Sequence, residues 1–153
     1  MRFTTALTAT AALLAPLARA ASNAIVFNNC TAPIYLWSVG STIGPQVTIA
    51  PSANYTEPFR VDTNSGGIAL KITRVENGLY SGAPQTIFAY NLQGNGVWYD
   101  LSDVFGDPFS GSRVEIVPSD DTCSEIIWED GVPPGGSEVR VCQSTTDLTL
   151  RTC

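Results

Sequence analysis

The chain has 153 residues, of which fourteen are acidic, eight are basic and none is histidine, and its formal net charge is −6. Without histidine it can hold neither a Ser-His-Asp or Cys-His nucleophilic site nor an H-E-x-x-H zinc site, and we expect no metal and no cofactor. The acid excess also disfavours nucleic acid and anionic lipid as partners, since both need Lys or Arg to neutralise phosphate.

Residues 1–20 are predicted to be a secretory signal peptide. Met1-Arg2 is a short positive start, residues 3–17 are mostly apolar and small, and Ala18-Arg19-Ala20 is an A-x-A cleavage signal. A transmembrane anchor fits less well, because the apolar run is short and Pro16 interrupts it. We therefore expect secretion without membrane insertion, and a single domain over residues 21–153.

The rest of the chain consists of short β-like runs separated by turn residues: 24–28, 34–39, 46–50, 68–74, 86–92, 97–101, 113–117, 138–142 and 147–150. Several runs alternate; Val114 and Ile116 fall on one face of their run, and Arg113 and Glu115 on the other. No segment has a sustained helical period, so the sequence predicts an all-β sandwich of short antiparallel strands. Residues 60–67 and 119–137 are expected to be loops, and the second carries many acids.

Four cysteines, Cys30, Cys123, Cys142 and Cys153, lie beyond the predicted signal peptide. An even number in a secreted domain predicts two disulfides, and three connectivities are possible. A zinc site is disfavoured because no two cysteines have C-x2-C spacing.

Three segments in a fixed order carry a resemblance to a known family. Residues 24–37 resemble an F-x-I-V-N-x-C-x-x-x-V-W opening, residues 86–106 end in YDLSDVFG, and residues 136–142 end in V-R-V-C. Together they are similar to the opening, central and closing motifs of the thaumatin-like superfamily, and most similar to its small fungal secreted group of yeast-phase-specific or antigenic proteins. The resemblance implies a disulfide-stapled thaumatin-like sandwich, secreted or associated with the cell wall; we expect a monomer.

The resemblance also bears on catalysis. In the enzymatic members of the superfamily, one Glu and two Asp line an acidic cleft. Only Asp100 matches here, because Ala89 stands at the Glu position and Phe105 at the second Asp position. We therefore expect no enzymatic activity; the alternative is a weak β-1,3-glucan hydrolase that uses Asp100 with a neighbouring acid, first of all Asp103.

The disulfide pairing that the resemblance implies is Cys30–Cys142, which leaves Cys123–Cys153. The rival pairing joins Cys123 to Cys142 and Cys30 to Cys153.

Aromatic side chains suggest what the protein binds. Trp37 and Trp98 are expected in the core, whereas Trp128, beside Glu129 and Asp130 in the acidic loop, is expected to be exposed. These three loop residues, with Asp100 and Tyr99, are the candidate ligand-binding residues. The expected ligand is a cell-wall polysaccharide or another extracellular surface component; the alternative is an effector or inhibitor that acts on another protein.

Two N-glycosylation sequons occur, Asn29-Cys30-Thr31 and Asn54-Tyr55-Thr56. Asn54 is expected in a loop and is the better candidate. Asn29 adjoins Cys30, whose disulfide would hide it.

Overall fold

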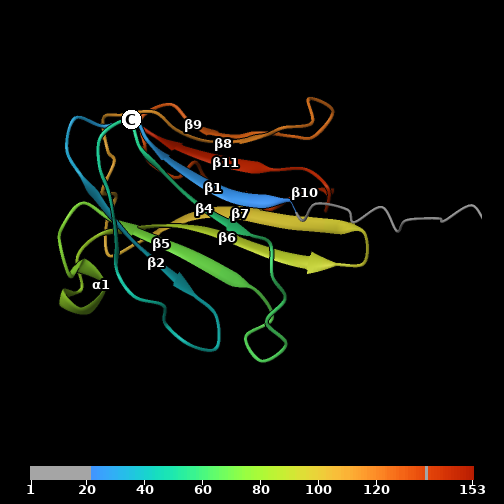
Figure 1. Cartoon of the computed structure of the whole chain (residues 1–153). Coiled ribbons are helices and arrows are strands. Elements are labelled where there is room, and N and C mark those ends of the chain that lie inside the picture. Colours follow the sequence, from blue (N-terminus) through green and yellow to red (C-terminus); the bar gives the residue numbers. More distant parts are fainter. Residues whose placement is uncertain (1–21, 137) are drawn as a thin grey trace, which may run out of the picture.

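The computed structural model describes residues 22–136 and 138–153, so the predicted signal peptide lies outside the described residues. These residues form two β-sheets that pack face to face (Figure 1). No helix among them is long and apolar enough to cross a membrane. The predicted all-β sandwich is confirmed.

Sheet A has five strands, in the spatial order β4 (Asn54–Pro58), β1 (Asn23–Asn28), β11 (Leu148–Thr152), β8 (Val114–Pro118) and β9 (Ile126–Trp128). Sheet B has six, in the order β10 (Arg140–Gln143), β7 (Gly96–Val104), β6 (Gln85–Gln93), β5 (Ile68–Thr73), β2 (Ile34–Val39) and β3 (Val47–Ile49). A single helical turn, α1 (Gly78–Ser81), follows β5. One pairing departs from the predicted antiparallel pattern, because β1 and β11 run parallel.

Alternation along the strands forms the core. In β7, Val97, Tyr99 and Leu101 are buried, and in β6, Phe88 and Tyr90 are buried. The residues between them face away from the sandwich. Because the side-chain period of a strand is two, each strand gives one face to the core and the other to an outer surface.

All nine predicted runs contain a strand, with bounds that differ by a few residues. Two strands and the helical turn were not predicted. β4 ends in Pro58 and buries none of its residues fully, and β9 has only three residues inside the predicted acidic loop. Neither carries enough alternation to stand out in the sequence.

The disulfide pairing implied by the resemblance is wrong. The bridges are Cys30–Cys153 and Cys123–Cys142, with Cα–Cα distances of 5.0 and 5.5 Å. The parallel pairing of β1 with β11 places Asn28 beside Thr152, so Cys30 and Cys153 follow at the same end of sheet A. Cys142 lies instead on β10, the edge strand of sheet B.

The expected exposure of Trp128 is also wrong. Trp128 is the last residue of β9 and pairs with Val114. It lies in the core and is only 1% exposed. The short strand β9 turns this part of the acidic segment into the edge of sheet A, which directs the indole inward.

A partly buried carboxylate links the two sheets. Glu57 of β4 accepts a hydrogen bond from the Tyr90 hydroxyl at 2.6 Å and from the Tyr55 hydroxyl at 2.7 Å. Burial, and then the Glu57 carboxylate, raise the pKa of Tyr55 to about 12 and raise that of Tyr90 as well. Because β4 belongs to sheet A and β6 to sheet B, this contact ties the edge of one sheet to the middle of the other.

Candidate ligand-binding faces

The outer face of sheet B carries an exposed tryptophan. Trp98 of β7 points away from the core, between the buried Val97 and Tyr99, and is 43% exposed. Its cross-strand neighbours are Asn91 on β6 and Val141 on β10, and both are exposed. The prediction that Trp98 lies in the core is therefore wrong. The alternation in residues 97–101 was the signal that could have corrected it.

A shallow hollow of about 280 Å³ lies beside Trp98. Asn91, Asp100 and Val139 line it together with the loop residues at the start of β5. We call the outer-facing residues Asn91, Trp98, Asp100 and Val141 the Trp98 face. This surface places an aromatic ring beside one carboxylate and one amide, the groups with which proteins contact sugar rings and sugar hydroxyls.

Asp100 has no carboxylate directly across from it. Its cross-strand neighbour on β6 is Ala89, the residue at the family's Glu position. Burial raises the pKa of the Asp100 carboxyl, and a hydrogen bond from the Leu101 backbone N–H opposes that rise. Phe105, at the other missing position, follows the end of β7 and is 71% exposed. Asp100 therefore lacks both acids that the enzymatic pattern would place near it.

Asp103 does not supply the missing acid. It lies three residues after Asp100 on the same strand, so the two side chains leave opposite faces of the sheet. Asp103 accepts a hydrogen bond from the Thr86 hydroxyl at 2.6 Å, and Thr86 is fully buried. Burial raises the pKa of Asp103 to about 7. Glycoside hydrolysis needs two carboxyls that flank one bond. Asp100 and Asp103 both line a hollow of about 270 Å³ together with Glu138, but the alternation of β7 directs the two Asp carboxyls to opposite faces of sheet B.

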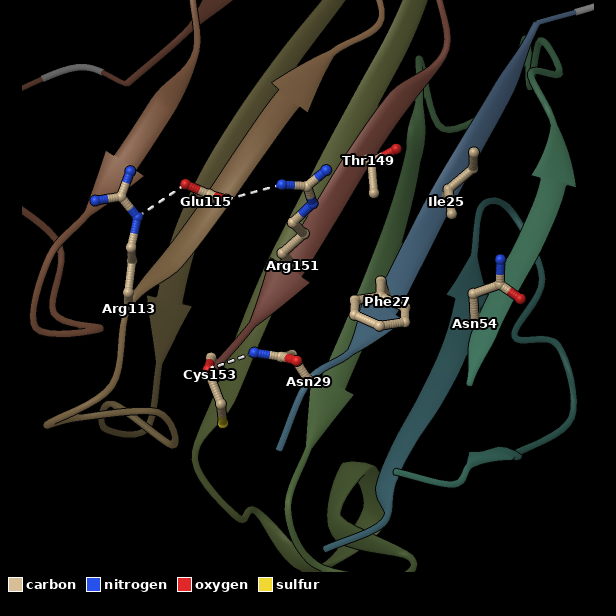
Figure 2. Close-up of a pocket in the computed structure, with 9 residues that line it drawn as sticks. All are labelled: Ile25, Phe27, Asn29, Asn54, Arg113, Glu115, Thr149, Arg151 and Cys153. Carbon is tan, nitrogen blue, oxygen red and sulfur yellow. Dashed lines mark hydrogen bonds and ion pairs between the residues drawn. The ribbon is translucent and has the colours of Figure 1, made fainter. Parts of the chain in front are cut away.

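The outer face of sheet A has a larger hollow, of about 590 Å³ (Figure 2). Phe27 of β1 lies on its floor, with Asn54 of β4 on one side and Arg151 of β11 on the other. Ile25, Thr149 and Glu115 also contribute to the lining. One apolar ring, that of Phe27, thus shares this surface with planar polar groups.

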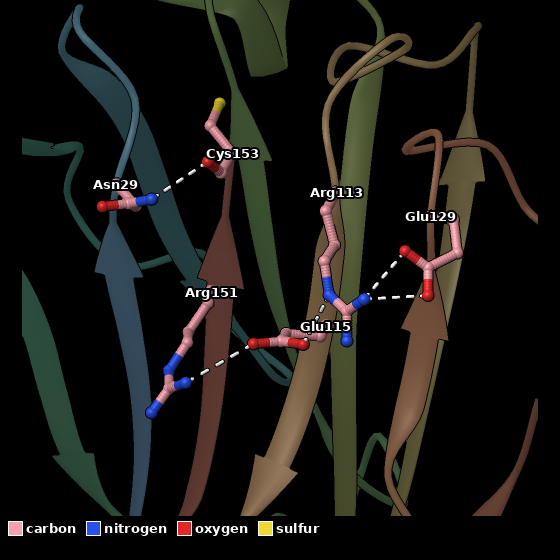
Figure 3. A network of polar contacts seen from close by, with 6 residues as sticks. All are labelled: Asn29, Arg113, Glu115, Glu129, Arg151 and Cys153. Atoms are coloured by element: carbon pink, nitrogen blue, oxygen red, sulfur yellow. Dashed lines mark hydrogen bonds and ion pairs between the residues drawn. The ribbon is translucent and has the colours of Figure 1, made fainter.

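Ion pairs run along one side of this hollow (Figure 3). Arg113 contacts Glu115 and Glu129 at 2.8 Å each, and Arg151 contacts Glu115 at 3.4 Å. Two arginines and two glutamates leave the group without net charge. Surface pairs of this kind contribute little to stability, and here they fix the orientation of the two guanidinium groups.

The predicted ligand-binding residues do not form one site. Glu129 joins the ion pairs of sheet A, Trp128 is in the core, and Asp130 is exposed in the turn that follows. Tyr99 is 1% exposed and donates its hydroxyl hydrogen bond to the Ser124 carbonyl. Of the five, Asp100 alone lies on the outer face of sheet B, beside the tryptophan that the sequence analysis had placed in the core.

A family model described as "Blastomyces yeast-phase-specific protein" matches residues 11–153. The antigenic thaumatin-like protein of Arthroderma benhamiae is 34% identical over 161 residues, which cover 97% of this chain and 80% of the relative. The secreted thaumatin-like protein calA of Emericella nidulans is 28% identical over 155 residues, which cover 94% and 88%.

Two solved structures share the fold. The protein elicitor MoHrip2 from Magnaporthe oryzae has 25% sequence identity and a TM-score of 0.72, and the match covers 87% of this chain and 99% of the elicitor. The thaumatin-like xylanase inhibitor TLXI has 11% identity and a TM-score of 0.56, over 85% and 98% of the two chains. At that identity the inhibitor supports the fold alone.

Proposed function

The chain belongs to the fungal thaumatin-like family described as Blastomyces yeast-phase-specific protein, and we propose that it is a non-catalytic protein that binds polysaccharide outside the cell through its Trp98 face. Residues 1–20 would direct its secretion and be removed. A relative named as secreted, and the elicitor with the same fold, support an extracellular place of action.

One observation carries the proposal: an exposed Trp98 lies in register between Asn91 and Val141, on the face that also presents Asp100. The C–H face of a sugar ring packs on an indole, because the aromatic face is electron-rich. The Asn91 amide and the Asp100 carboxylate can then accept hydrogen bonds from sugar hydroxyls, and the amide can also donate. With Ala89 opposite Asp100, this surface can hold a sugar but has no carboxyl on the neighbouring strand β6 to act with Asp100 in cleaving it.

The test is a binding screen of residues 21–153 against insoluble β-1,3-glucan, chitin and mannan, with reducing ends measured in the same samples. Trp98→Ala should weaken binding about 5- to 150-fold, which corresponds to about 1–3 kcal/mol for a large apolar contact. Phe105→Ala is the matched control, because Phe105 is more exposed than Trp98 and lies beyond the other end of β7. That control should bind as the parent protein does.

Two results would contradict the proposal. Equal retention of the parent and the Trp98→Ala variant on every polysaccharide would remove the Trp98 face from the binding site. Reducing ends that appear with the parent and vanish with Asp100→Asn would show the weak hydrolase instead.

A second function, binding to a protein, is favoured by the apolar side chains around Trp98. Val139 and Val141 are 47% and 48% exposed beside it, and the elicitor has the same fold. If the chain binds a protein, no polysaccharide should retain it, and Trp98→Ala should abolish the response that cells show to the purified protein.

A further inference from the structure

Asn54 and Phe27 are cross-strand neighbours on the outer face of sheet A. They oppose each other in the antiparallel pairing of β4 with β1, and both line the hollow shown in Figure 2. Asn54 opens the edge strand β4, and its side chain is exposed. Side chains that oppose each other in this way have Cβ atoms about 4.5–5.5 Å apart. A group attached to the Asn54 amide therefore starts next to the Phe27 ring.

The two sequons differ in what their amides do. The Asn29 amide donates a hydrogen bond to the Cys153 carbonyl at 3.0 Å, beside the Cys30–Cys153 bridge (Figure 3). The Asn54 amide makes no hydrogen bond within residues 22–136 and 138–153. A sugar on Asn29 would crowd the bridge and the last residue, whereas a sugar on Asn54 displaces no contact of the described chain.

We propose that Asn54 carries an N-linked glycan whose first sugars lie over Phe27 and fill the hollow of sheet A. The hollow, about 590 Å³, is within the range of about 300–1,000 Å³ that holds compact ligands. Phe27 supplies an aromatic face for a sugar ring, and the Thr149 hydroxyl and Arg151 guanidinium lie where they can bond its polar groups.

This arrangement gives the two outer faces different occupants. The protein's own glycan covers sheet A and shields β4, an edge strand whose unpaired backbone groups would otherwise accept another chain. The Trp98 face of sheet B remains free. The inference rests on secretion, which is part of the proposed function, but not on any polysaccharide ligand.

The test uses residues 21–153 secreted from a yeast host behind the host's own leader, so the outcome does not depend on residues 1–20. All described strands and both disulfides lie within this range. Intact mass should show one glycan, which Asn54→Gln and Thr56→Ala both remove and Asn29→Gln leaves in place. Binding to polysaccharide plays no part in this readout, so a failure here is distinct from a failure of the proposed function.

Contact with the ring is tested by thermal unfolding. The glycosylated protein should melt about 3–5 °C above the Thr56→Ala protein, and this difference should disappear when Phe27 is replaced by Leu. Phe27→Leu keeps an apolar side chain at this partly buried position, so the fold should persist without the ring. An unmodified Asn54, a glycan on Asn29 instead, or a melting difference unchanged by Phe27→Leu would each overturn the inference.

Discussion

Replacing Asp103 by Asn should make the protein more stable at pH 8 while changing it little at pH 4. The Asp103 carboxyl accepts one hydrogen bond from Thr86, and its second oxygen is buried with no donor among the described residues. A protonated carboxyl can instead donate to Asp107, whose charge also raises the pKa. Asparagine reproduces that protonated form, with an oxygen for Thr86 and an N–H for Asp107.

The size of the effect follows from the pKa. Burial raises the pKa of Asp103 from 3.8 to about 7, so between these values the folded chain binds a proton that the unfolded chain has released. The stabilisation that the Asp103 proton contributes is therefore fully present below pH 3.8 and is lost as the pH rises to 7. About three pKa units would correspond to about 4 kcal/mol at 1.36 kcal/mol per unit. Asp103 is only half-buried, and solvent screening reduces this to about 1–2 kcal/mol.

The assay is urea unfolding at pH 4, 6 and 8, followed by tryptophan fluorescence with both disulfides intact. Asp62→Asn is a control of opposite sign, because backbone N–H groups of Ser41 and Ser65 bond the Asp62 carboxylate and lower its pKa. That control should lose stability at pH 8 rather than gain it. If Asp103→Asn keeps the parent's loss of stability between pH 4 and pH 8, the protonation argument is refuted.

Two further predictions concern what holds the sandwich together. Glu57→Gln should lower the free energy of unfolding by about 1–3 kcal/mol, because it weakens charge-assisted bonds from two tyrosines. Glu129→Gln is the control: the Glu129 side chain is 70% exposed, so this substitution should change the free energy of unfolding by less than about 0.5 kcal/mol. Equal effects of the two substitutions would show that the Glu57 carboxylate does not brace the sheets. Replacing Cys30 and Cys153 together by Ser should lower the free energy of unfolding by about 5 kcal/mol, whereas replacing Cys123 and Cys142 together should lower it by about 3 kcal/mol. The difference arises because the sequence separation is 123 for the first bridge and 19 for the second. A non-reducing peptide map that links Cys30 to any other cysteine would contradict this pairing.

The sequence by itself determined the fold class and the position of most strands. Alternation is a local property: because Val97, Tyr99 and Leu101 leave one side of β7 for the core, Trp98 and Asp100 must leave the other. The sequence analysis did not use this pattern for Trp98, which it assigned to the core. The loss of the enzymatic acids was likewise visible in the identity of Ala89 and Phe105. These inferences needed no knowledge of which strands are neighbours.

Tertiary structure decided everything that depends on strand order. The parallel pairing of β1 with β11 brings Cys30 to Cys153 although 123 residues separate them, and no local pattern encodes that neighbour. The pairing of β9 with β8 turns Trp128 inward, and the register of β6 with β7 sets Ala89, rather than an acid, against Asp100. Side-chain direction follows from neighbouring residues along a strand, whereas contact between strands follows from how the whole chain folds, and the binding faces depend on both.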